Sequence, residues 1–321
     1  ALTPQDIAVL ILCALAHDLG MHITFAGFCA IIHDEYNENQ LNEVFKDKNW
    51  SRLWYEYKKE IRLWDQKKKT SVFGKNFDIV EIPDDPLELT ELQRMIIGEF
   101  LRWHHHRLAQ DIITGGFPMR AGEYKEFFSD KYEYHNLQTM TALLVRSHGE
   151  NAWRMVDTVE QIYGRTLSLS RLYNCHFPYV MALLRLSDYL DMSEERACLD
   201  IYRKHDYFSS VSALEWEFNQ CISFLDFKES GPERLYIWVS EPRNSSLFLK
   251  IQRHLKEMQN ELDTCWAVLG YTKTQEELSI RHISSNLNIE GGLKDSVPYL
   301  PEPIYFCLLY TSDAADDLIG V

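Results

Sequence analysis

The chain has 321 residues, of which 45% are hydrophobic and 25% charged, so it can bury a large core and is too apolar to be disordered. Aromatic residues are abundant, while 14 Gly and 10 Pro are too few for a turn-rich β-sandwich, which favours an all-α or α-dominated fold. The formal net charge of -15 argues against a general nucleic-acid-binding surface, because such surfaces need clusters of Lys and Arg.

The cysteines predict a reducing compartment. There are seven, an odd number, and none forms a C-x-x-C pair. No uninterrupted apolar run reaches the roughly 18 to 20 residues that span a bilayer. We therefore expect a cytoplasmic protein without a membrane segment.

The first predicted helix covers residues 3–16. It opens with Thr-Pro, a helix-start signature, and is then apolar on every face, so we expect it to be buried on all sides. It ends at His17 and Asp18, and Gly20 then allows the chain to turn.

A second apolar stretch, residues 23–32, precedes an amphipathic segment at 39–66. Large side chains recur along that segment at roughly helical spacing: Trp50, Trp54, Tyr57, Ile61 and Trp64. We interpret residues 34–88 as a helical insertion packed on the outside of the core, with 67–88 as a connecting loop.

Further helices are predicted at about 87–113, 136–148, 152–163, 171–190 and 246–269. Residues 221–240 alternate like two strands around a turn, which predicts a β-hairpin. We expect one domain over residues 1–215 and a C-terminal extension over 216–306, with the hairpin and helices.

Both ends of the chain raise separate expectations. Residues 307–316 resemble the translation of a transposase sequencing adapter, so we expect 307–321 to be a non-native tail. The chain also starts at the threshold of a helix, so we expect native residues upstream of Ala1.

Three His-Asp dipeptides occur, at residues 17–18, 33–34 and 205–206. Only His17-Asp18 ends a wholly apolar helix, where a carboxylate needs a partner or a metal ion. The other two lie among polar residues and are interpreted as solvated helix ends.

Additional ligand candidates follow in apolar helical contexts. Three consecutive histidines occupy positions 104–106, of which at most one or two can face one site, because helical neighbours point about 100° apart. His148 precedes a helix-ending Gly, and Asp188 lies on the face of Leu184. A set of His and carboxylate ligands suits one or two ions of Mn, Fe, Ni or Zn rather than Mg alone, which could activate water and bind phosphate oxygens.

This order of His-Asp, His, His and Asp resembles the HD-domain metal phosphohydrolases, and is most similar to the HD-CE branch. The motifs that carry the resemblance are Ala16-His-Asp-Leu-Gly-Met21, Arg102-Trp-His-His-His-Arg-Leu-Ala109, Ser147-His-Gly149 and Leu184-Arg-Leu-Ser-Asp-Tyr-Leu-Asp191. The resemblance implies an HD-type helical bundle. It also implies a C-terminal GHKL-type ATPase, to which that branch is often joined.

The resemblance further implies a metal site with His17 as a terminal ligand and Asp18 as the bridge. His105, at R-x-x-H spacing from Arg102, His148 and Asp188 would complete the set. The family's first histidine normally precedes the HD pair by some tens of residues, and the chain starts too late to contain it.

Structural roles remain alternatives for these residues. His105 could be a packed residue on a helix face with no ligand role. His148 could occupy the end of its helix because the helix dipole favours histidine there, and Asp188 could pair with Arg185 or Arg102. Three arginines are candidates for orienting a substrate phosphate, with ordinary ion pairing as the alternative: Arg102, Arg146 and Arg196.

The expected function is hydrolysis of a phosphomonoester or phosphodiester, with a nucleotide as the candidate substrate, and with His17 and Asp18 in the catalytic site. The alternative is a catalytically silent HD-fold sensor that regulates a downstream GHKL-type ATPase.

Overall fold

The computed structural model describes residues 2–36, 40–78, 81–83, 85–120, 123–128, 134–164, 172–197, 210–226, 231, 233–273 and 276–287, with the backbone alone at 40–42, 196 and 210–212. It divides into two compact units. Of the described residues, the first unit takes those within 2–191, 210–213 and 260–281, and the second takes those within 192–197, 214–259 and 282–287. The predicted domain boundaries stay predictions, and residues 205–206 and 307–321 lie outside the described residues.

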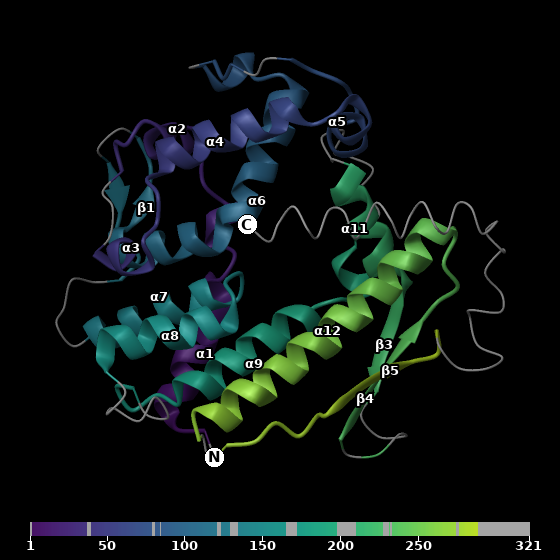
Figure 1. The fold of residues 1–321 in the computed structure, drawn as a ribbon. Coiled ribbons are helices and arrows are strands. Elements are labelled where there is room, and N and C mark those ends of the chain that lie inside the picture. The colour runs from purple at the N-terminus through teal and green to yellow at the C-terminus, as the bar shows by residue number, and fades with distance from the viewer. Residues whose placement is uncertain are drawn as a thin grey trace. The chain divides into compact units, whose positions relative to one another are not determined.

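Helices dominate the first unit, which confirms the predicted fold class (Figure 1). Its elements are α1 (Pro4–Ala16), η1 (Leu19–Met21), α2 (Phe25–Ile32), α3 (Gln40–Phe45), α4 (Trp50–Leu63), α5 (Gln66–Phe73), η2 (Pro86–Glu88), α6 (Glu91–Gly115), β1 (Phe117–Pro118), β2 (Tyr124–Lys125), α7 (His135–Ser147), α8 (Ala152–Tyr163) and α9 (Phe177–Leu190). The C-terminal part of α12 (Ser245–Tyr271) also belongs to this unit.

Side-chain caps explain where the long helices begin. Thr3 and Asp6 form a capping box at α1, with Pro4 in the first turn. Thr90 and Gln93 form the same arrangement at α6. These caps satisfy amide groups that have no partner within the helix.

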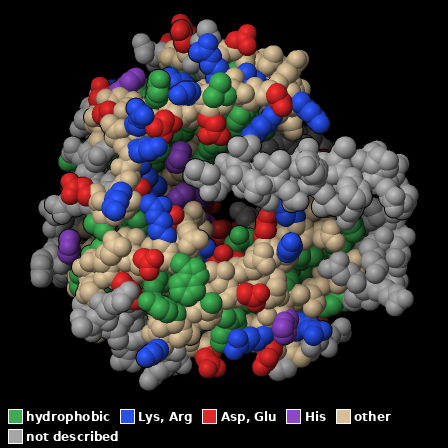
Figure 2. Space-filling view, in the orientation of Figure 1, with side chains coloured by type: hydrophobic (Ala, Val, Ile, Leu, Met, Phe, Trp, Pro, Cys, Tyr) green, Lys and Arg blue, Asp and Glu red, His purple; other side chains and the backbone are tan. Residues whose placement is uncertain are grey.

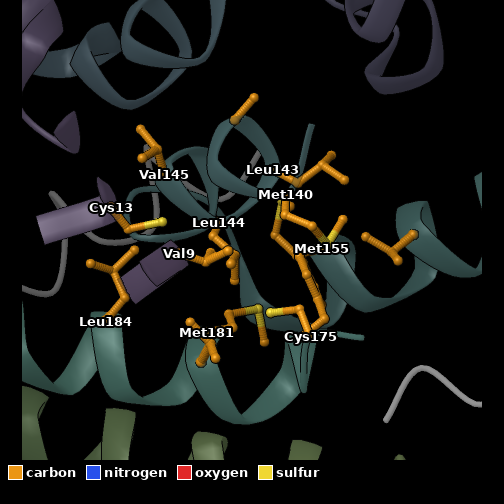
Figure 3. Close-up of a cluster of buried hydrophobic side chains, with 14 of the residues drawn as sticks. Val9, Cys13, Met140, Leu143, Leu144, Val145, Met155, Cys175, Met181 and Leu184 are labelled. Atoms are coloured by element: carbon orange, nitrogen blue, oxygen red, sulfur yellow. The ribbon is translucent and has the colours of Figure 1, made fainter. Parts of the chain in front are cut away.

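Helix α6 separates two hydrophobic cores. One side of α6 contributes Ala109 and Ile113 to a core formed mainly by α1, α7, α8 and α9. Figure 3 shows Val9 and Cys13 of α1 pointing toward α7 and α9 in this core. The other side contributes Phe100 and Leu108 to a second core, shared with α2 and α4.

The predicted insertion builds that second core. Four of the five predicted side chains lie buried on α4: Trp50, Trp54, Tyr57 and Ile61. The predicted loop at 67–88 was wrong for its first part, because α5 covers Gln66–Phe73. Asp65 caps the amide of Lys68, and Gly74 ends α5 with a left-handed φ of 74°.

Helix α1 is not buried on every side, so that prediction was wrong. Ile7, Ile11 and Leu15 are 46%, 55% and 75% exposed, and their spacing of four places them on one face. The opposite face packs against α7 and α9. Apolar composition alone therefore did not decide burial.

The segment Pro4–Met21 has the length and composition of a membrane-spanning helix, with a mean hydropathy of 1.2, and 28% of it is buried. It is not one continuous α-helix, because α1 ends at Ala16 and η1 follows. Core helices of globular domains share this composition.

The second unit contains η5 (Glu194–Arg196), α11 (Ser210–Cys221) from Leu214 onward, the first part of α12 and three strands. Strands β3 (Ile222–Asp226) and β4 (Arg234–Val239) pair antiparallel, as the alternation at 221–240 predicted. Strand β5 (His282–Ser285) adds to β4 in parallel, and no sequence pattern predicted it.

Candidate metal centre

His17 and Asp18 reach the site from the end of α1. His17 is the C-cap residue of this helix, and Asp18 precedes η1. Gly20 makes the close approach possible, because a Cβ atom there would overlap the backbone carbonyl oxygen of His105 on α6. The Gly that follows the His-Asp pair therefore lets η1 lie directly against α6.

His148 reaches the same place from the end of α7, where it is the C-cap residue. The next residue, Gly149, lies against the ring of His106, which a Cβ atom would overlap. Two glycines thus allow two helix ends to approach the middle of α6.

Asp18, His105 and His148 each offer a ligand atom within 4.8 Å of the others. His105 Nε2 lies 2.8 Å from His148 Nε2 and 3.5 Å from Asp18 Oδ1. Figure 2 shows histidine side chains grouped over α6, with acidic side chains beside them. This cluster could hold a metal ion.

The remaining two predicted ligands adjoin the cluster. His17 Nε2 lies 3.5 Å from Asp18 Oδ2 and 3.6 Å from Asp188 Oδ1. The two oxygens of Asp18 therefore face different histidines, His105 on one side and His17 on the other. The structure brings all five predicted ligand residues together.

The same local hydrogen bond orients all three histidines. Nδ1 of His17, His105 and His148 lies 3.0, 2.6 and 2.5 Å from the carbonyl oxygen three residues earlier. A carbonyl only accepts, so each Nδ1 must donate its proton, and in the neutral ring Nε2 then carries a lone pair. Metal-binding histidines use such bonds to fix ring and tautomer.

A comparison with known proteins agrees with this geometry. The family model HD-CE matches residues 1–264. The chain belongs to the HD-CE family. No curated protein and no solved structure matches it. The resemblance found in the sequence motifs is thereby confirmed at the level of the HD-type domain.

Without a metal ion, His17 and Asp188 favour each other's charged forms in this HD-CE site. Contact with Asp188 raises the pKa of His17 to about 9. Burial favours the neutral carboxyl of Asp188, but the hydrogen bond with His17 and the charges of the surrounding histidines together outweigh burial and lower the pKa of Asp188. Burial lowers the pKa of His148 to about 4, which keeps this ring neutral.

The three consecutive histidines of the HD-CE chain have different surroundings. His105 alone joins the ligand cluster among the described residues. His104 lies against Phe100 and Trp50, with ring centroids 4.9 and 6.1 Å away. Burial lowers the pKa of His104 to about 4 and that of His106 to about 2, so both are neutral rings packed beside the site.

The predicted phosphate-orienting arginines separate into three cases. Arg146 is 2% exposed, is bonded to Asp47 at 2.5 and 2.9 Å, and lies over the ring of Phe45. This points to the structural role that was the alternative for Arg146, because its charge is already paired away from solvent. Arg102 is partly exposed and lies 3.6 Å from Glu99. The side chain of Arg196 lies outside the described residues.

One contact near the HD-CE site was not expected. The sequence suggests Arg185 as a partner for Asp188, but in the structure its guanidinium pairs with Glu261 and with carbonyl groups next to His148. Glu261 is 76 residues away in the chain, so no local pattern could have indicated the pair.

Proposed function

We propose that this chain is a metal-dependent phosphohydrolase that cleaves a phosphomonoester or a phosphodiester, with a nucleotide as the first substrate class to test. His17, Asp18, His105, His148 and Asp188 would hold one or two divalent ions. His17 and Asp18 would lie at the catalytic centre.

The observation that carries the proposal is the approach of His105 Nε2 to within 2.8 Å of His148 Nε2. Both rings direct Nδ1 to a backbone carbonyl, so their lone pairs face each other in the neutral state. Two facing lone pairs repel unless a cation or a proton lies between them. A carboxylate oxygen of Asp18 beside them supplies the negative charge that favours a metal cation.

The donor set fits a transition metal. Imidazole nitrogen with carboxylate oxygen suits Mn, Fe, Ni or Zn, whereas Mg favours oxygen ligands. A divalent ion in this site would supply positive charge to phosphate oxygens and lower the pKa of the attacking water. The protein residues would hold the ligands in place, and the partly exposed Arg102 remains a candidate for orienting the phosphate.

The proposal includes a reducing, cytoplasmic location. All five cysteines among the described residues are free thiols. Cys13 and Cys175 line the same hydrophobic core without forming a disulfide (Figure 3). A GHKL-type ATPase as a further partner rests on the family resemblance alone.

The test is to measure metal content and hydrolysis together. We expect the purified protein to bind Mn²⁺, Ni²⁺ or Zn²⁺ and to hydrolyse p-nitrophenyl phosphate, bis-p-nitrophenyl phosphate or a nucleotide, with a chelator abolishing turnover. Asp18→Asn should lower both metal affinity and turnover by more than about 100-fold, because even residues that only support ligands commonly contribute 10- to 100-fold.

His33→Ala is the matched control, since it alters a second His-Asp dipeptide whose histidine is exposed at the end of α2. It should leave metal binding and turnover unchanged. A protein that binds no metal, or an Asp18→Asn variant that retains full turnover, would contradict the proposal. Nucleotide binding without turnover in the metal-loaded protein would favour the alternative sensor function.

A further inference from the structure

Arg185 lies on α9, three residues before Asp188, and is 7% exposed. Its Nη1 donates to the carbonyl oxygen of Ser147 and, at 2.6 Å, to that of Glu150. These two carbonyl groups lie on either side of His148 in the chain. One guanidinium thus holds the backbone before and after a candidate metal ligand.

Glu261 of α12 holds that guanidinium in turn. Arg185 Nε lies 2.5 Å from Glu261 Oε1, and Nη2 lies 3.0 Å from Oε2. This two-point contact fixes the plane of the guanidinium as well as its position. Cys265 Sγ, one turn later on α12, lies 3.6 Å from the same Oε1 and donates to it.

The end of α7 depends on such support. The amides of His148, Gly149 and Glu150 make long bonds of 3.3 to 3.4 Å to carbonyls three residues earlier. Carbonyl groups in the last turn of a helix lack intrahelical partners, and a cation at that end is favourable. Arg185 provides both a hydrogen-bond donor and a cation there.

We infer that Arg185 and Glu261 are positioning residues that hold His148 Nε2 opposite His105 Nε2. The inference rests on the proposed metal site. Both residues act through His148: Arg185 fixes the backbone from which the ring projects, and Glu261 fixes Arg185. The C-terminal helix α12 therefore contributes to the centre without supplying a ligand.

The first test measures affinity for Mn²⁺ and Zn²⁺ alone, by chelator competition, in Glu261→Gln and Arg185→Lys. We expect each variant to weaken binding about 10-fold, the lower end of the range for residues that orient metal ligands. The double variant should bind about as weakly as either single one, because the two residues act as one unit.

The second test needs no metal. Amide hydrogen exchange at residues 148–150 should accelerate about 10-fold in both single variants of the metal-free protein, since the loop loses its anchor. Exchange in the middle of α7 should stay unchanged.

Tyr36→Phe is the matched control for lost stability. Its buried hydroxyl lies 2.9 Å from the carbonyl of Asp111 and 2.6 Å from that of Gly116, so this variant also removes a donor from two carbonyl groups. It should lower the melting temperature without changing metal affinity or exchange at residues 148–150.

The outcomes separate the two proposals. If the wild type binds metal but neither variant changes affinity or exchange at 148–150, the positioning role is wrong and the metal site stands. If the wild type binds no metal but exchange responds as expected, the proposed function fails and the anchoring of His148 stands. If Glu261→Gln and Arg185→Lys change metal affinity and exchange at 148–150 no more than Tyr36→Phe does, the pair is purely structural and the inference is overturned.

Discussion

The same dipeptide, His-Asp, follows two helices of this protein and serves two purposes. His17 and His33 are both C-cap residues, of α1 and α2. Asp18 turns toward α6 and joins His105 and His17. Asp34 is exposed, has a left-handed φ of 56°, and accepts hydrogen bonds from the amide and hydroxyl of Ser51 in the first turn of α4. It therefore caps a helix.

These two dipeptides show that the residues around a motif decide its chemistry. Gly20 comes two residues after Asp18 in the chain and allows backbone contact with α6. The second pair is followed by Glu35 and Tyr36, and its aspartate meets a helix start that lacks its own side-chain cap at Asn49. Asp6 and His176 also form an aspartate–histidine contact, but they are distant in the chain, so only folding brings them together, and both are buried.

Among substitutions outside the ligands themselves, the largest effect on this comparison is expected from Gly20→Ala. The added methyl group would push η1 away from α6 and carry Asp18 away from His105, at a cost of about 1 to 3 kcal/mol. We expect metal affinity to fall about 10- to 100-fold. Metal titration and thermal unfolding measure the two effects.

Gly98→Ala is the control for that substitution, because a Cβ atom there meets nothing within 4 Å on the same helix α6. It should keep metal affinity and raise stability by about 0.5 to 1 kcal/mol, as Ala is the better helix former. Unchanged metal binding in Gly20→Ala would show that the close approach is not needed.

The buried pair of Asp6 and His176 should show in the pH dependence of folding. Burial raises the pKa of Asp6, but hydrogen bonds from Thr3 and His176 outweigh it and hold the pKa at about 2, below its ordinary value of 3.8. A depressed folded-state pKa stabilises the fold above pH 3.8, and this stabilisation is lost as the pH falls toward 2.

The size of that contribution is about 2 kcal/mol at neutral pH. Urea unfolding between pH 2 and 7 should therefore show a gap between wild type and Asp6→Asn that is full above about pH 4 and shrinks toward pH 2. A gap that does not change with pH would mean that protonation of Asp6 is not linked to folding.

The smallest effect is expected from Asp34→Ala. It removes the bonds to the amide and hydroxyl of Ser51, and loss of a helix cap costs about 1 kcal/mol. Metal affinity should not change. Thermal unfolding and metal titration check both parts, and weaker metal binding would mean that the two His-Asp pairs are coupled.

Most of the helical fold could be predicted because its signals are local. The start of α8 at Asn151 and the alternation of β3 and β4 were visible in the sequence. The start of α9 was placed too early, since this helix begins at Phe177 with Pro178 in its first turn. Strand β5 escaped notice because four residues carry too little periodicity and its partner β4 is distant in the chain.

The candidate site was only partly predictable. Context separated His17-Asp18 from the other dipeptides, and R-x-x-H spacing favoured His105. Sequence patterns could not show that Arg146 is enclosed by Asp47 and Phe45, because these two residues are distant from Arg146 in the chain.

Local signals were enough to predict the helical class, the family and a short set of candidate ligands, since helix periodicity, caps and motif spacing act over a few residues. Four features became visible only in the folded chain: η1 lies against α6 at Gly20, His105 faces His148, one face of α1 is exposed, and Arg185 pairs with Glu261. These features depend on contacts between segments distant in the chain, which packing alone selects.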